Sequence, residues 1–261
     1  MSASIQTENR QKGSWRRLVG FLVVVLVLGS LAAQTGFPWE EVDHLNDSSQ
    51  FDAAYVLLRQ APDTSSAAFL WRMARHFFNV SDNTNAEQEI TSAIHKGLTY
   101  AERALVADEY SGEAHGYYGI LIGRVGEIEG TRQKIINSYA VREHTLRAIE
   151  LNPDFDSWYH VMGRWHYALA ELSWIERTVA SIVYTAPPEA TFEDAETFFM
   201  QASDLAPSDI RHLLWLGKTR IALDMVSSAR ASLEQAISLS VTSESDRIMQ
   251  AEAKALLEDL N

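Results

Sequence analysis

Two alanine–proline pairs at one spacing constrain this chain more than any other feature. In each pair an alanine is followed five residues later by a proline: Ala148 and Pro153, Ala202 and Pro207. Within ten residues of each proline comes a hydrophobic–glycine step: Met162-Gly163 and Leu216-Gly217. Proline ends a helix and small residues let two helices approach closely, so this pattern is typical of tetratricopeptide (TPR) hairpins. The sequence therefore predicts an all-α fold, a TPR-like superhelix of paired helices.

The last unit has the regular TPR period. Gly217 precedes Ala236 by 19 residues, and Ala202 precedes Ala236 by 34 residues, which is one standard repeat. The unit before it is longer, because Gly163 lies 39 residues before Ala202. The array is therefore divergent and carries insertions or long second helices.

Four segments follow from composition and periodicity. They are a basic flank at 1–17, an apolar run at 18–33, a polar linker at 34–49 and a helical-repeat domain at 50–261. The apolar positions of the repeat domain recur with helical spacing. They predict helices at 50–61, 65–79, 85–107, 111–126, 129–150, 154–171, 173–184, 192–204, 208–223, 226–240 and 244–260.

The apolar run at 18–33 carries no charge and follows Arg16-Arg17. As a helix it spans about 24 Å, slightly less than the ~30 Å hydrocarbon core of a bilayer. It is either a transmembrane anchor or a signal peptide cleaved near Ser30-Leu31-Ala32. In both cases the repeat domain lies across the membrane, on the periplasmic or envelope side. Cleavage would make it a secreted or periplasmic protein.

The charge and the residue types limit the functions available. The formal net charge is -13, and the first 33 residues contribute +3, which leaves -16 on the rest. A body this acidic repels phosphate backbones, so no nucleic-acid partner is expected. The chain has no cysteine, and its histidines lack the spacing of a metal site; His160 and His166 fall on different faces of one helix. We therefore expect no catalytic residue, no metal and no cofactor.

The position after the glycine of each TPR hairpin faces the concave groove of the array. Three of the four such positions are basic and form the predicted head-group site: Arg75, Arg164 and Lys218. Aromatic residues nearby form the predicted apolar wall: Trp71, Tyr167, Trp165 and Trp174. Such a groove suits a phospholipid or an acidic peptide. The alternative is that the basic residues only pair with acids of neighbouring helices.

The helix expected at 173–184 interrupts the third hairpin. Its apolar residues include Trp174, Ile175 and Val179. Two interpretations remain open at this point. The helix either extends the core or forms a lid that faces a bound lipid.

A series of motifs resembles a known family. They occur in a fixed order: LWRMAR at 70–75, GEIEGTRQKII at 126–136, REH at 142–144, AIELNP at 148–153, GRW at 163–165, LSWIER at 172–177, PP at 187–188 and FEDA at 192–195. The series is similar to the regulator of microtubule dynamics family and covers roughly residues 45–225. The resemblance implies a helical, TPR-like protein. One animal member is a mitochondrial outer-membrane protein that tethers to the endoplasmic reticulum and whose TPR-like domain binds phospholipids.

These observations favour a non-catalytic, membrane-anchored binding module. Its concave groove would hold an anionic amphiphile such as a phospholipid. The alternative is a protein–protein interaction scaffold of the cell envelope that binds a peptide or a partner helix.

Overall fold

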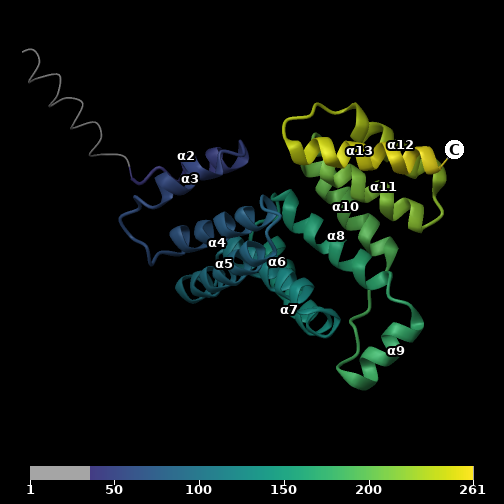
Figure 1. The fold of residues 1–261 in the computed structure, drawn as a ribbon, viewed down its shortest axis with the longest axis horizontal. Coiled ribbons are helices and arrows are strands. Elements are labelled where there is room, and N and C mark those ends of the chain that lie inside the picture. Colours follow the sequence, from purple (N-terminus) through teal and green to yellow (C-terminus); the bar gives the residue numbers. More distant parts are fainter. Residues whose placement is uncertain (1–35, 261) are drawn as a thin grey trace, which may run out of the picture.

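The computed structural model describes residues 36–260, which fold into helices joined by short turns (Figure 1). The helices are α2 (Trp39–Asp47), α3 (Phe51–Leu58), α4 (Ala67–Asp82), α5 (Glu87–Ala107), α6 (Gly112–Glu129), α7 (Thr131–Leu151), α8 (Asp156–Ala170), α9 (Trp174–Val183), α10 (Phe192–Leu205), α11 (Ile210–Ala222), α12 (Val226–Ser238) and α13 (Glu244–Asp259). The prediction of an all-α chain is confirmed.

Neighbouring helices pair into hairpins that follow one another along the molecule. The pairs are α4 with α5, α6 with α7, α8 with α10, and α11 with α12. At one end α3 packs against α4, and at the other end α13 packs against α11 and α12. Figure 1 shows α9 standing away from the stacked hairpins; in the sequence it lies between the two members of the third pair.

The prolines lie just after helix ends, and the glycines lie where two helices approach closely. Helix α7 ends at Leu151 and α10 ends at Leu205, each two residues before a proline. A Cβ added to Gly163 would lie 2.6 Å from the ring of Phe199, and one added to Gly217 would lie 2.6 Å from Leu233. These approaches are too close for any side chain. The glycine steps therefore mark the contacts of α8 with α10 and of α11 with α12, as predicted.

Two polar caps frame the insertion in the third hairpin. Ser173 and Glu176 form a capping box that begins α9. Thr191 begins α10 by accepting a hydrogen bond from the Asp194 backbone N–H at 3.0 Å. Both caps are formed by residues next to the helix that they begin, so the starts of α9 and α10 are set locally.

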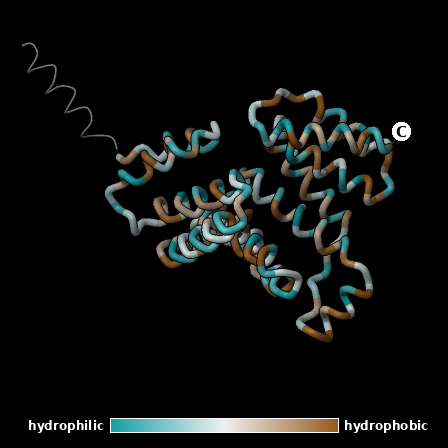
Figure 2. The backbone as a smooth tube through the Cα atoms, in the orientation of Figure 1, coloured by the Kyte–Doolittle hydropathy of each residue, from teal (hydrophilic) through white to brown (hydrophobic). Residues whose placement is uncertain are grey.

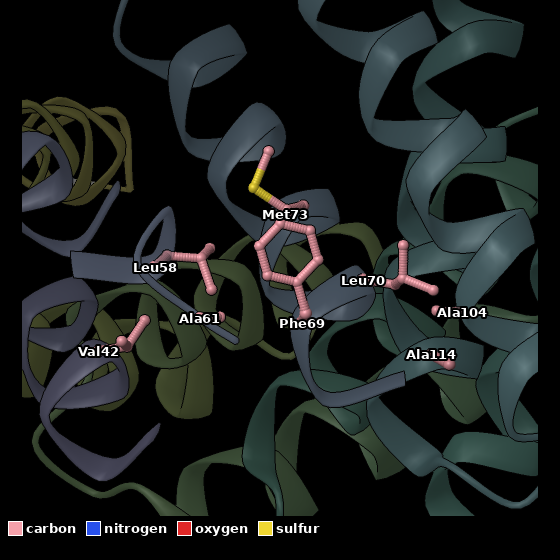
Figure 3. Packing of buried hydrophobic residues seen from close by; sticks show 8 residues of the cluster. All are labelled: Val42, Leu58, Ala61, Phe69, Leu70, Met73, Ala104 and Ala114. Carbon is pink, nitrogen blue, oxygen red and sulfur yellow. The ribbon is translucent and has the colours of Figure 1, made fainter. Parts of the chain in front are cut away.

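The segment at 34–49, assigned above to a linker, contains helix α2. Val42 is its fully buried apolar residue, and it belongs to a core that α2, α3 and α4 share. Figure 3 shows Leu58 lying between Val42 and Phe69. A nine-residue helix with one buried aliphatic residue has almost no periodicity to detect, which is why the sequence did not reveal it.

No helix between residues 36 and 260 is both long and apolar enough to cross a bilayer. The apolar run at 18–33 lies outside the described residues, so the anchor and the signal peptide remain predictions.

Candidate functional site

The first helices of the hairpins, together with the terminal helix α13, contribute charged residues that lie within electrostatic reach of one another. We call this surface the inner face and define it by the following residues: Asp82 on α4, Arg124 and Glu127 on α6, Arg164 on α8, Arg211 and Lys218 on α11, and Glu252 on α13. Residues far apart in sequence thus meet because the hairpins stack with their first helices on one side.

Arg124 forms two ion pairs at the end of the inner face where α4 meets α6. Its guanidinium lies 3.2 Å from the carboxylate of Asp82 and 3.0 Å from that of Glu127. Burial raises the pKa of Asp82 above its ordinary value, and the positive charge of Arg124 opposes that rise. The pairs are partly solvated, so they fix the position of Arg124 more than they stabilise the fold.

Arg164 occupies the middle of the inner face. Its guanidinium carbon lies 3.9 Å from the ring centre of Trp215, and the Lys218 ammonium lies 4.1 Å from the same ring. The surrounding helices remove part of the water around Arg164 and thereby lower its pKa, although it remains charged at neutral pH. Within residues 36–260 it has no carboxylate close enough for an ion pair, and its side chain is exposed. Arg164 therefore presents a positive charge that an incoming anion can reach.

The other two predicted cations have acidic partners. Arg75 lies 2.5 Å from Asp47 and 3.6 Å from Asp43, both on α2. Lys218 lies 2.8 Å from Glu252 on α13. Of the predicted head-group residues, Arg164 and Lys218 are brought together at Trp215. Arg75 lies at the α2 end, where its charge reaches Tyr117.

Two of the four predicted wall residues lie beside these cations. Tyr167 packs edge-on against Trp215, with ring centres 5.3 Å apart. Trp71 stacks on Tyr117 at 6.0 Å, next to Arg75 on α4. The aromatic wall therefore has two separate parts, one beside Arg164 in the inner face and one beside Arg75, outside it.

The remaining two wall residues lie elsewhere. Trp165 is buried in a core cluster with Val141 and Met162, and its Nε1 donates a hydrogen bond to the Ser138 carbonyl at 2.8 Å. It follows Arg164 directly, so the helical turn carries it to a different face. Trp174 is exposed on α9. The structure does not bring either residue to Arg164.

The sequence analysis did not select three residues of this region. Trp215, Arg211 and Arg124 all belong to it, and Trp215 is the ring that holds two of the cations. The spacing of Arg211, Trp215 and Lys218, at i, i+4 and i+7, places them on one face of a helix and was a usable signal.

A buried chain of polar groups lies beside the inner face. Asp156 accepts a hydrogen bond from His212 Nε2 at 2.8 Å, and His212 Nδ1 lies 3.0 Å from His160 Nδ1. Asp156, His212 and Asp209 are close enough to hold a metal ion, a grouping that the sequence did not predict. The Arg211 guanidinium lies 2.8 Å from the Asp209 carboxylate and 3.6 Å from that of Asp156. Arg211 therefore already supplies the positive charge that a metal ion would bring. We assign these hydrogen-bonded side chains a structural role, because they join α8 to α11.

This buried chain predicts acid-sensitive stability. Burial, together with Arg211, His212 and Arg164, lowers the pKa of His160 well below its ordinary value. The unfolded chain then binds the proton more readily, so stability is complete above the unfolded pKa of about 6.5 and falls as the pH drops below it. We expect the free energy of unfolding to fall from pH 7 to pH 5, by at most about 1.4 kcal/mol per pH unit for this group.

Urea unfolding at pH 7, 6 and 5 measures this slope. His160→Gln should flatten it, whereas His95→Gln, at an exposed position on α5, should keep it. Equal slopes for His160→Gln and the wild type would assign the acid sensitivity to other groups.

Comparison with known proteins places the chain in a family. Residues 39–261 match the family described as regulator of microtubule dynamics protein 1-3. Regulator of microtubule dynamics protein 1 of Bos taurus is 37% identical over 220 residues, covering 84% of this chain and 69% of that protein. Protein 3 of Xenopus laevis is 37% identical over 139 residues, covering 53% of this chain and 30% of that protein.

Solved structures agree on the fold. A thermophilic TPR protein of Thermus thermophilus superposes with a TM-score of 0.59 at 14% identity, covering 84% of this chain and 97% of that one. Pseudomonas aeruginosa pilF superposes with a TM-score of 0.51 at 12% identity, covering 85% and 86%. The TPR-like fold is thereby confirmed, and so is the resemblance found in the sequence motifs. The chain belongs to the regulator of microtubule dynamics family.

Proposed function

We propose that this chain is a non-catalytic binding module whose inner face takes an acidic segment of a partner protein at Arg164. The observation that carries the proposal is the exposed guanidinium of Arg164, held over Trp215 without an acidic partner among residues 36–260. TPR-like arrays commonly bind an extended segment along their concave side. A carboxylate of that segment would form a charge-assisted hydrogen bond with Arg164.

The charge pattern of the inner face supports a peptide ahead of a phospholipid. Asp82, Glu127 and Glu252 stand among the cations and act on Arg164 from three other helices. The phosphate of a lipid offers only acceptors, so these carboxylates repel it unless another group of the lipid pairs with them. A peptide offers backbone N–H donors to the acids and a carboxylate to Arg164. The mixed signs therefore match a peptide better.

An anionic amphiphile such as a phospholipid is the second candidate, and one observation favours it. Tyr167 and Trp215 form an aromatic surface directly beside Arg164 and Lys218. An acyl chain could lie on these rings while its head group meets the two cations.

Membrane attachment is a further part of the proposal. The apolar run at 18–33 would hold the module at a bilayer, with the repeat domain on the periplasmic or envelope side. The partner would then be a protein, or the exposed tail of one, at the same surface.

Charge reversal at Arg164 is the direct test. A displayed peptide library is selected on the immobilised full chain, and selected peptides are measured by titration calorimetry. We expect selection of peptides with acidic side chains, and we expect Arg164→Glu to weaken their binding by about 10- to 100-fold. This range corresponds to the loss of one charge-assisted hydrogen bond, about 1.5–3 kcal/mol.

Arg147→Glu is the matched control, because Arg147 lies on α7 in an exposed pair with Glu150, outside the inner face. It should leave binding unchanged. Peptides that bind Arg164→Glu as tightly as the wild type would refute the proposed site. Lipid that co-elutes on native mass spectrometry and is lost in Arg164→Glu would instead favour the second candidate.

A further inference from the structure

Helix α9 turns its apolar face toward solvent. Its large hydrophobic residues are all exposed, with Ile182 at 79% and Trp174 at 78%; the others are Ile175, Val179 and Val183. Figure 2 shows hydrophobic residues on this protruding helix, away from the stacked hairpins. In a globular protein such a face is usually covered by something, because its exposure to water is unfavourable.

Contacts on the opposite side of α9 fix the direction in which the apolar face points. Ala180 is 3% exposed, so it lies on the covered side of the helix. Arg177 donates hydrogen bonds to the carbonyls of Leu169 at 2.5 Å and Pro188 at 3.3 Å, one on each side of the insertion. With Ala180 and Arg177 facing inward, the helical repeat directs Ile175, Val179 and Ile182 outward. The orientation of α9 is therefore fixed, and its apolar face points to solvent.

The segment that follows α9 contacts the first half of α7, which places one positive charge beside the apolar face. Tyr139 donates a hydrogen bond to the Ala186 carbonyl at 2.6 Å, which joins α7 to the segment after α9. The Arg132 guanidinium lies 5.7 Å from the ring centre of Tyr184. Arg132 is exposed. A cation thus stands at the edge of an apolar surface in a chain whose overall charge is -13.

The size of the surface argues against a second copy of the chain as its occupant. Helix α9 has ten residues, which gives a length of about 15 Å and a width of about 10 Å. A symmetric contact between two such helices covers far less than the ~800 Å² per partner of a stable interface. A lipid surface has no such minimum, because each inserted side chain contributes separately.

We propose that the exposed face of α9 inserts into the surface of a bilayer that contains anionic lipids. Trp174 and Tyr184 stand at the two ends of the helix, aliphatic residues lie between them, and Arg132 lies beside the Tyr184 end. Aromatic residues favour the headgroup level, aliphatic residues enter the acyl boundary, and basic residues attract anionic headgroups. The apolar run at 18–33, expected to reach a membrane, would bring the chain to such a surface. The inner face takes no part.

The absence of cysteine from the sequence makes a site-specific test straightforward. Ile182→Cys is labelled with an environment-sensitive dye in the full chain. The chain is then mixed with or reconstituted into vesicles of phosphatidylcholine and phosphatidylglycerol that carry a lipid-bound quencher. We expect the dye at position 182 to shift to the blue, to be quenched by the lipid and to be shielded from iodide in water. Val106→Cys, at an exposed apolar position on α5, should show none of these changes.

Two charge-reversal variants serve as controls for the labelling experiment. Arg132→Glu should shift the equilibrium away from insertion by at least about fivefold, the effect of roughly 1 kcal/mol per basic residue near an anionic surface. Arg164→Glu should leave the dye signal unchanged, so a failure of the inner-face proposal is distinguishable from a failure here. The same iodide access at position 182 with and without vesicles would overturn the proposal. So would a lipid-independent shift that grows with protein concentration, since that marks a second copy.

Discussion

Replacing Trp158 with alanine is expected to lower the free energy of unfolding by about 3–5 kcal/mol, the usual cost of a large cavity in a core. Trp158 is 1% exposed, and its ring lies where a Cβ on Gly116 would be, only 2.4 Å away. It also packs edge-on against Tyr117 at 5.6 Å. The side chain therefore joins α8 to α6 at a place where α6 supplies no atoms to fill the space.

Trp174→Ala is the matched control, because it removes the same side chain from an exposed position on the neighbouring helix α9. It should change stability by no more than about 0.5 kcal/mol. Urea unfolding followed by far-ultraviolet circular dichroism measures both variants. Similar losses in the two, or a loss below about 1 kcal/mol for Trp158→Ala, would contradict the packing described for α6 and α8.

The second large effect is expected at the contact that holds α2 on the array. The Arg72 guanidinium forms two hydrogen bonds with the Asp43 carboxylate, at 2.9 and 2.5 Å. It also lies between two rings, 4.7 Å from the centre of Trp39 and 4.0 Å from that of Trp71. Asp43→Ala leaves Arg72, a residue that is only 8% exposed, without its acid.

We expect Asp43→Ala to destabilise the protein by about 2–3 kcal/mol, less than the loss for a fully buried pair because Asp43 keeps some contact with water. Hydrogen exchange should rise first along residues 39–47. Glu150→Ala removes the acid of an exposed pair and should cost no more than about 1 kcal/mol. Unchanged exchange along α2 in Asp43→Ala would mean that Val42 alone holds the helix in place.

The sequence predicted the hairpins well because their signals are local. Pro153 and Pro207 end helices by removing a backbone donor, and Gly163 and Gly217 mark close helix contacts whatever surrounds them. Helix α2 was not predictable in this way. It is held by the distant partners Arg72 and Leu58 and not by a periodic pattern of its own.

The candidate site was only partly predictable. The position after the repeat glycine led to Arg164 and Lys218, which do converge at Trp215. Which cations keep an acidic partner depends on helices that the repeat pattern does not describe. Arg75 is paired by α2 and Lys218 by α13, at opposite ends of the array. A residue pattern within one hairpin contains no information about such terminal helices.

The base of the insertion has a practical consequence for protein engineering. Arg177 bonds the Leu169 and Pro188 carbonyls, so one side chain closes the gap between the points where the chain leaves and rejoins the third hairpin. Whatever lies beyond that closure transmits little strain to the stacked helices. The tip of this excursion is accordingly a place to graft an epitope or a fluorescent reporter while the remaining architecture folds as before.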